Sequence, residues 1–252
     1  MPVAFIGHGS PMNAIETNVY TEAWRAFAAG LPKPRAIVAI SAHWDIPGGG
    51  VTGNAHPPTI HDFGGFPPAL FALEYPAPGD PALAAEVAGL LALGNDRILQ
   101  RWGLDHGTWS VLVHMYPQAD VPVIQIAVDT TRDAAFHWDL GARLGALRER
   151  GILILGSGNI VHNLAALRFD AREPAAWNAR FDAAIADALE RGDRDALLGY
   201  ERLPDAALAA PDAEHFVPVL AVAGAQRPGD AVRTIVSGST LGSISMRSFA
   251  FG

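Results

Sequence analysis

A chain of 252 residues with 50% apolar side chains has a globular composition and enough apolar surface for a sizeable core. Its formal net charge of −8 argues against a nucleic-acid partner, and no basic segment is present to hold it on a membrane surface. The absence of cysteine excludes disulfides, thiolate nucleophiles, iron–sulfur clusters and cysteine-ligated zinc. With neither a signal-peptide pattern nor an apolar run of about 20 residues, the chain is expected to be cytoplasmic.

Short apolar runs that are rich in Val or Ile and that end in Gly, Ser or Asp predict the buried strands. In chain order these runs are Val3–Ile6, Ala36–Ser41, Val121–Val128 and Gly151–Leu155. Two last strands, Arg233–Ser237 and Ser243–Ala250, lie close enough in the sequence to form a hairpin.

Apolar residues at helical spacing predict the elements between the strands. One helix starts at Asp80-Pro81 and stops near Gly94, a second carries Phe136 to Leu147, and a third runs from about Ala175 to Glu190. Strands that alternate with helices are typical of an α/β fold. We therefore expect one domain over residues 1–252, with a mostly parallel central sheet flanked by helices.

Three of the nine histidines come just after predicted strands: His8, His43 and His162. The carboxyl ends of parallel strands meet at one edge of a sheet, which is where ligands bind in α/β folds. His106 and His215 lie in or near turns. Neutral imidazole suits Zn, Fe, Cu and Ni, and three such rings can hold one ion while leaving positions open for a substrate. This pattern predicts a metal site at the strand carboxyl ends.

Structural roles compete with metal binding for several of these histidines. His8 and His43 could be hydrogen-bonded residues at loop starts, and the neighbouring Glu214 could be the ligand in place of His215. His114, on a predicted helix Trp109–Met115, and His137 are expected to be structural or surface residues. His56 and His61 lie in the segment Gly48–Pro68, which is too long for a plain connection and is therefore expected to be functional.

Six motifs, in this order, resemble those of the class III extradiol ring-cleavage dioxygenases of the 4,5-DOPA dioxygenase type. They are Gly7-His8-Gly9-Ser10-Pro11-Met12, Ser41-Ala42-His43-Trp44, His61-Asp62-Phe63-Gly64-Gly65-Phe66-Pro67, Leu104-Asp105-His106-Gly107-Thr108-Trp109, Gly156-Ser157-Gly158-Asn159-Ile160-Val161-His162-Asn163 and Glu214-His215-Phe216-x-Pro218. The resemblance runs from Met1 to at least Pro218. The segment Ser237–Phe251 is similar to the closing strands of that family.

The resemblance implies a role for each histidine of these motifs. His8, His43 and His215 match the metal ligands. His162 matches the catalytic base, which also lies near enough to the ion to be counted as a ligand in some members, and His106 matches a second catalytic histidine. The implied reaction inserts O₂ into a catechol such as L-DOPA and opens the ring to a semialdehyde.

The same resemblance suggests which residues surround the substrate and which ion is bound. His61 and Phe63 match the pocket wall, and Trp44 is a further aromatic candidate for contact with the catechol. The cofactor is expected to be one non-haem divalent metal, Fe(II) for activity, although Zn(II) also suits the site. The protein is expected to be a monomer or a small homo-oligomer.

One departure from the wider class leaves an alternative open. That class uses two histidines and a glutamate, the triad suited to Fe(II) oxygenases. Here His215 stands at the third position, and three neutral histidines are also a typical zinc site. A zinc hydrolase with Glu214 as the base is therefore the alternative function.

Overall fold

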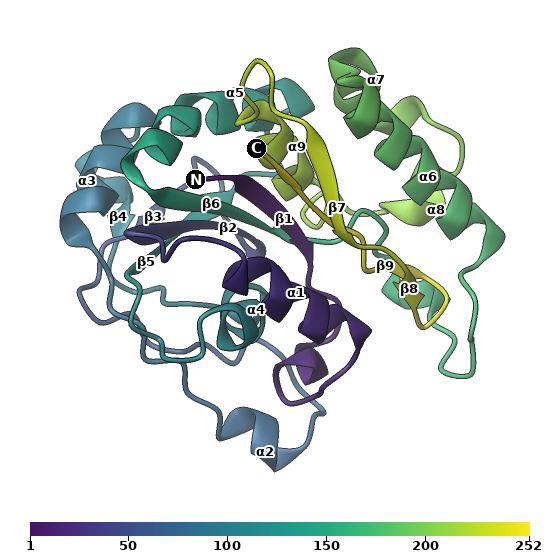
Figure 1. Ribbon diagram of the computed structural model, residues 1–252, viewed down its shortest axis with the longest axis horizontal. Coiled ribbons are helices and arrows are strands. Elements are labelled where there is room, and N and C mark those ends of the chain that lie inside the picture. Colours follow the sequence, from purple (N-terminus) through teal and green to yellow (C-terminus); the bar gives the residue numbers. More distant parts are fainter.

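The buried apolar runs form the centre of an eight-stranded sheet in the computed structural model, which describes residues 1–252 (Figure 1). Its strands are β1 (Val3–Gly7), β2 (Ala36–Asp45), β3 (Val51–Thr52), β4 (Ile98–Leu99), β5 (Val123–Val128), β6 (Ile152–Gly158), β7 (Val232–Val236) and β10 (Ser248–Phe251). They lie in the order β4-β3-β5-β2-β6-β1-β10-β7. The four central strands β5, β2, β6 and β1 are parallel, whereas β10 and β7 are antiparallel to their neighbours. The prediction of a mostly parallel α/β sheet is confirmed.

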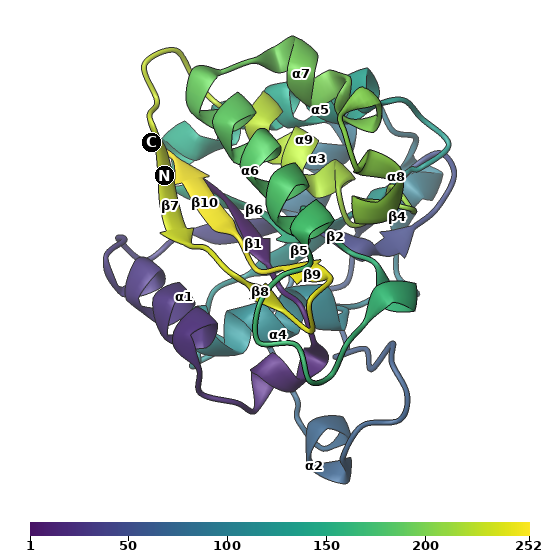
Figure 2. The same ribbon diagram turned by 90° about the vertical axis from the view of Figure 1, so that its right-hand side faces the viewer.

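Helices cover both faces of this sheet. They are α1 (Val19–Ala29), α2 (Pro68–Phe71), α3 (Pro81–Leu90), α4 (His106–Met115), α5 (Ala134–Leu144), α6 (Ala176–Arg191), α7 (Arg194–Leu198), α8 (Ala206–Ala209) and α9 (Val217–Gly224). Figure 2 shows α6 and α7 above the sheet and α1 and α4 below it. None of these helices combines the length and the apolar character that a membrane crossing requires.

Neighbouring residues of the central strands point into two different cores, because side chains alternate across a strand. Val3 and Phe5 of β1 pack into the core under α5, α6 and α9, whereas Ala4 and Ile6 pack into the core over α1 and α4. Every residue of α9 is buried, which places the start of this helix deep in the molecule beside β6.

Local sequence explains most of the helix ends. The Asp80 carboxylate accepts a hydrogen bond from the Leu83 N–H at the start of α3, and Gly192 ends α6 in a left-handed conformation. The expected stop of α3 near Gly94 is wrong, because the chain already turns left-handed at Ala92, with φ of 57°.

Two further predictions need correction, one of a loop and one of a strand. The segment Gly48–Pro68 contains β3, which joins the sheet beside β5. The predicted strand Ser243–Ala250 is divided into β9 (Ile244–Ser245), which pairs with β8 (Ser239–Thr240), and β10. The expected pairing with the preceding strand holds only for β10, which is antiparallel to β7.

A buried arginine ties both ends of the chain to the sheet. The Arg148 side chain is 2% exposed and forms an ion pair with Asp230 at 2.6 Å. Its guanidinium also donates to the carbonyl oxygens of Met1, Ala225 and Phe251. Removing the charge on one side of a buried pair leaves the other charge without compensation.

Arg148→Met is therefore expected to lower the free energy of unfolding by about 3–5 kcal/mol, measured by urea denaturation. The matched control is Arg150→Met, because Arg150 pairs with Glu86 at the exposed surface, where an ion pair contributes about 0–1 kcal/mol. Equal effects of the two substitutions would contradict the structural role given to Arg148.

Candidate metal centre and active site

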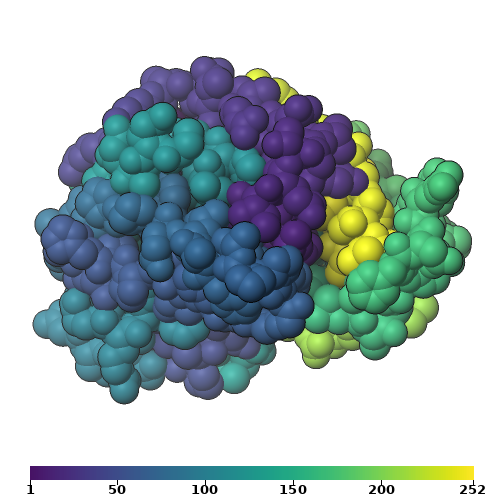
Figure 3. Space-filling model, turned by 90° about the horizontal axis from the view of Figure 1, so that it is seen from below, coloured from purple at the N-terminus to yellow at the C-terminus, as the bar shows by residue number.

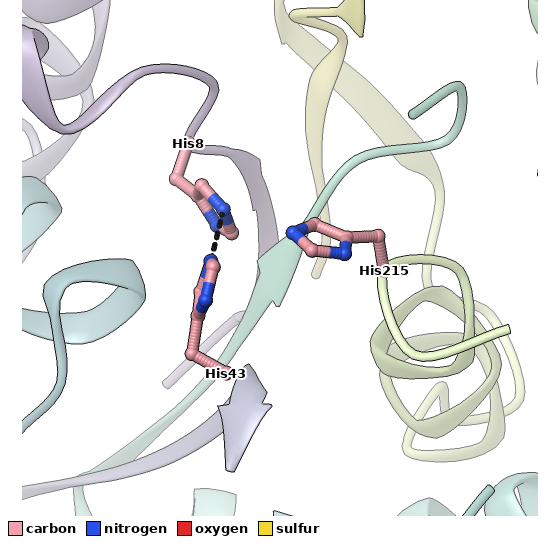
Figure 4. Close-up of side chains that lie close together, drawn as sticks. All are labelled: His8, His43 and His215. Carbon is pink, nitrogen blue, oxygen red and sulfur yellow. Dashed lines mark hydrogen bonds between the residues drawn. The ribbon is translucent and has the colours of Figure 1, made fainter. Parts of the chain in front are cut away.

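Three histidines from distant parts of the chain meet at the carboxyl ends of β1 and β2 (Figure 4). His8 directly follows β1, His43 lies near the end of β2, and His215 precedes α9. The pairing of β2 with β5 shifts its register between Ser41 and Asp45, and such an irregularity re-aims the side chains it carries. One nitrogen from each of the three rings lies within 4.8 Å of the others.

The environment of His8 fixes which of its nitrogens carries the proton. The Ser157 hydroxyl donates a hydrogen bond to the Gly107 carbonyl, so its oxygen is free to accept. His8 Nδ1 lies 2.9 Å from that oxygen and therefore carries the donated proton. The Nε2 of His8 is left with a bare lone pair.

Asp62 orients two further histidines. Its Oδ2 lies 2.9 Å from His106 Nδ1 and 3.3 Å from His43 Nδ1, while its Oδ1 accepts from the His106 backbone N–H at 2.9 Å. Burial alone would raise the pKa of Asp62, but the hydrogen bonds and proximity of His106 lower it overall. The charged carboxylate accepts the Nδ1 proton of His106, and its charge favours a proton on Nδ1, the His43 nitrogen that faces it, so the Nε2 atoms of both rings carry lone pairs.

His8 and His43 therefore turn two lone pairs toward each other. Their Nε2 atoms are 3.1 Å apart, and neither has a proton to share across the contact marked in Figure 4. Two nitrogens bound to one ion at about 2.1 Å lie roughly 3.0–3.4 Å apart, so the spacing fits a shared metal ion.

His215 completes this arrangement. Its Nδ1 donates to Glu214 Oε1 at 3.1 Å, while its Nε2 is buried and has no hydrogen-bond partner. A buried nitrogen without a partner is unfavourable unless a cation or proton meets it. Glu214 thus contacts the Nδ1 side of the His215 ring, and this contact orients the Nε2 of His215 toward His8 and His43. The donor set fits one divalent ion with three imidazole ligands.

Burial and the neighbouring histidines keep these rings neutral, which is the form that binds a metal ion. Burial, together with the neighbouring histidines, holds the pKa of His8 and the pKa of His215 well below their ordinary range. Burial likewise lowers the pKa of His43 to about 3. Neutral imidazole is the form that coordinates an ion, so the site does not need to lose protons before it binds one.

His162 and His106 stand beside the three rings. The His162 ring stacks on that of His215, with centroids 3.5 Å apart and an interplanar angle of 8°. Burial lowers the pKa of His162 to about 4, and one of its nitrogens lies within 4.8 Å of a Glu214 oxygen and a His215 nitrogen. His106 is the first residue of α4, and its ring centroid lies 3.8 Å from that of His43. The predicted helix Trp109–Met115 starts earlier because Asp105 caps it by accepting from the Thr108 N–H.

A cavity of about 470 Å³ opens over these histidines. Segments from the two ends of the chain and from its middle form the walls, and Figure 3 shows purple, blue, green and yellow segments meeting on this face. The lining consists of His8, Gly9, Ser10, Pro11, His43, Asp62, Phe63, Phe66, His106, His162, Leu164, Leu167, Phe169, Glu214, His215, Thr240, Leu241 and Ile244. All four histidines expected at the metal and the second catalytic histidine, His106, therefore share one cavity.

Two of the residues expected to contact substrate lie outside this lining. Trp44 follows His43 in β2, and because successive strand residues point to opposite faces, it stacks on Trp102 instead, with centroids 5.6 Å apart. The His61 ring has its Nε2 3.0 Å from the Leu73 carbonyl and packs behind Phe63. Phe63 does line the cavity, edge-on to His106.

The sequence reading missed two residues that prepare the site. Ser157 sets the proton on His8, and Asp62 sets the protons on His43 and His106. Both lie inside the quoted motifs, next to glycine or histidine. That position is the sequence signal that could have indicated a role at the site. Their action depends on contacts between residues far apart in the sequence, such as Asp62 with His106 and Ser157 with His8, which local patterns do not reveal.

Asp62→Asn is expected to weaken metal affinity and turnover by about 10–100-fold, the usual effect of losing an outer partner of a ligating histidine. An amide cannot hold both Nδ1 protons as a carboxylate does, so one ring loses its orientation. Metal titration followed by spectroscopy measures the effect. The control is Asp96→Asn, because the Asp96 side chain is 84% exposed and does not line the cavity. An Asp62→Asn protein with unchanged metal affinity would contradict this role.

Residues 3–249 match the family described as the catalytic LigB subunit of aromatic ring-opening dioxygenase. The chain belongs to this LigB family. The chain is similar to the 4,5-DOPA dioxygenase extradiol of Escherichia coli K12, with 43% identity over 100% of this chain and 95% of that protein.

Further relatives agree with this membership of the LigB family. The 4,5-DOPA dioxygenase extradiol of Beta vulgaris is 38% identical, with 88% of this chain and 85% of that protein covered. The crystal structure of an uncharacterized protein from Escherichia coli K12 covers 100% of both chains with a TM-score of 0.87 and 38% identity. The LigB chain is thus an extradiol aromatic ring-opening dioxygenase, and its cluster of histidines is the candidate metal site of that activity.

Proposed function

We propose that this dioxygenase opens a catechol such as L-DOPA to a semialdehyde at one Fe(II) ion held by the Nε2 atoms of His8, His43 and His215. The observation that carries the proposal is the convergence of three ring nitrogens, each left free because the other nitrogen of its ring faces a protein oxygen. When bound, Fe(II) would favour the deprotonated catechol and provide a route for electrons from the ring to O₂.

His162 is the proposed general base. Its neutral ring lines the cavity beside His215, and no protein group occupies its nitrogens. It can therefore take the second hydroxyl proton of a catechol whose oxygens face the three ligands. The position of His162 favours this role, because the base must lie beside the metal ligands to reach a hydroxyl group of the bound catechol.

His106 is the proposed second proton carrier. Its Nδ1–H is held by Asp62, so its other nitrogen can accept a proton, and the carboxylate stabilises the resulting imidazolium. Phe63 and Phe66 pack edge-on, with centroids 5.4 Å apart, on the same side of the cavity. Apolar rings in this position would keep water from the reacting atoms.

The test is to load the protein with Fe(II) without air, add L-DOPA and then admit O₂. Oxygen uptake with a yellow semialdehyde, absent from a Zn(II)-loaded control, is the expected result, because zinc has no redox chemistry. Hydrolytic activity in the zinc-loaded protein, with no oxygen uptake by the iron-loaded protein, would instead support the zinc hydrolase.

A further inference from the structure

An exposed arginine stands at the rim of the cavity over the histidines. The residues on either side of Arg168, Leu167 and Phe169, both line the cavity. The Arg168 backbone N–H donates to the carbonyl oxygen of Leu241 at 2.9 Å, and Leu241 is also a lining residue. The backbone of Arg168 is therefore fixed at the edge of the cavity.

The segment that carries Arg168 forms the open side of this cavity. Phe169 is 84% exposed and Leu164 is 61% exposed, although both line it. His8 and His215, by contrast, are buried at its closed end. A catechol whose two oxygens face these histidines directs a side group on the opposite side of its ring toward the open side, where Arg168 stands.

The guanidinium of Arg168 has no partner of opposite charge. It takes part in none of the ion pairs or side-chain hydrogen bonds of the structure, whereas Arg247 is bound to Asp182 at 2.7 Å. The guanidinium lies against Gly242, where a Cβ would come within 3.2 Å of its Nε and Nη2 atoms. The Arg168 side chain can therefore turn toward a ligand by rotation about its own bonds, without breaking an ion pair.

The inner part of the cavity offers no such cation to an anionic group. None of its 18 lining residues is Lys or Arg, and the two charged ones are the acids Asp62 and Glu214. A carboxylate held among them would lose water without gaining a partner. A carboxylate at the mouth would instead meet a guanidinium, which binds carboxylates through two parallel N–H···O hydrogen bonds.

We propose that Arg168 binds the carboxylate on the side group of the catechol, and that it thereby selects catechols such as L-DOPA that carry one. The inference rests on the proposed catechol cleavage and adds a residue that determines its specificity. Leu167 and Phe169 would cover the apolar stem of the same side group. Because the reacting atoms lie among the histidines, a contact at the mouth should have the same strength before and during the reaction. Its loss should therefore raise KM and leave kcat unchanged.

The first experiment compares dihydrocaffeic acid with its methyl ester, a pair that differs in the charge at the end of one side group. In the Fe(II)-loaded Arg168→Gln protein, kcat/KM for the acid is expected to fall about tenfold or more, through KM. The value for the ester should stay unchanged. Arg168→Lys keeps a cation and should restore most of the value for the acid. An equal change for both compounds, or no change for either, would overturn the proposed role.

Arg172→Gln is the matched control. Arg172 is exposed and lies in the same segment, but neither it nor its neighbours line the cavity. The substitution should change neither value. A selective loss for the acid in Arg172→Gln but not in Arg168→Gln would give the role to Arg172 and contradict the proposal.

Reversing the charge separates direct pairing from a disturbed segment. Arg168→Glu is expected to lower kcat/KM for dihydrocaffeic acid further and to raise it for dopamine, whose side group ends in an ammonium. A segment that is merely disturbed would lower the values for both compounds, which would count against the proposal.

Binding of dihydrocaffeic acid to the Fe(II)-loaded proteins without O₂ separates this inference from the proposed function. Weaker binding to Arg168→Gln than to the unchanged protein, with oxygen uptake by the unchanged protein once air is admitted, supports both. Weaker binding to Arg168→Gln without oxygen uptake by either protein supports the role of Arg168 and contradicts the dioxygenase assignment. Equal binding to the two proteins contradicts the role of Arg168, whether or not turnover occurs.

Discussion

The His8→Ala protein is expected to bind no stoichiometric Fe(II) and to open no catechol ring. His8 supplies one of three converging Nε2 lone pairs, and its ring is buried at the centre of the cluster. Losing a ligand should exceed the roughly 100-fold loss of affinity that follows removal of an outer partner. Elemental analysis after Fe(II) loading, together with oxygen uptake, measures both effects.

His43→Ala should behave in the same way, because its Nε2 lies 3.1 Å from that of His8. The control is His56→Ala, which removes an exposed imidazole outside the cavity and should leave metal content and turnover unchanged. Full metal occupancy in the His8→Ala protein would refute the ligand assignment.

The His162→Gln protein is expected to keep its metal and to lose about 10²–10⁴-fold in kcat, the usual contribution of a general base. His162 stacks on His215 and lies outside the His8, His43 and His215 group, although it forms a second possible metal-binding group with Glu214 and His215. Glutamine retains a polar side chain of similar reach, yet it cannot accept a proton near neutral pH. The measurements are the metal content and the steady-state rate with a saturating catechol.

The metal content of this variant decides between two roles for His162. If His162→Gln also loses its ion, His162 is a fourth ligand and the base must be sought elsewhere, with His106 as the next candidate. If both metal and rate are retained, His162 has neither role. A retained ion with a lowered rate is the result that the geometry predicts.

Sequence patterns predicted the parts of the fold that depend on local chemistry. Buried Val and Ile runs gave the four central strands, and the Asp80-Pro81 start of α3 follows from its cap. The two-residue strands β3 and β4 are too short for a period of two to be recognised. The early end of α3 depends on a left-handed Ala92, a conformation that alanine rarely adopts.

The sequence likewise predicted some residues of the candidate site and not others. His8, His43 and His162 could be placed at one sheet edge because the carboxyl ends of parallel strands share an edge, and the motifs added His106 and His215. The proposed preference for His215 over Glu214 as the ligand rests on the contact between His215 Nδ1 and Glu214 Oε1, which turns the His215 Nε2 into the cluster. Strand alternation alone could have separated Trp44 from His43, since adjacent residues of β2 face opposite sides.

The fate of labelled oxygen tests the central claim most directly. Fe(II)-loaded protein is given L-DOPA under ¹⁸O₂, and the ring-opened product is trapped and analysed by mass spectrometry. Insertion of O₂ at a metal held by His8, His43 and His215 predicts label from the gas in the product, with none formed by the His8→Ala protein. A product without label under ¹⁸O₂ that takes up label in a parallel reaction in H₂¹⁸O would contradict the dioxygenase and point to hydrolysis at the same histidines.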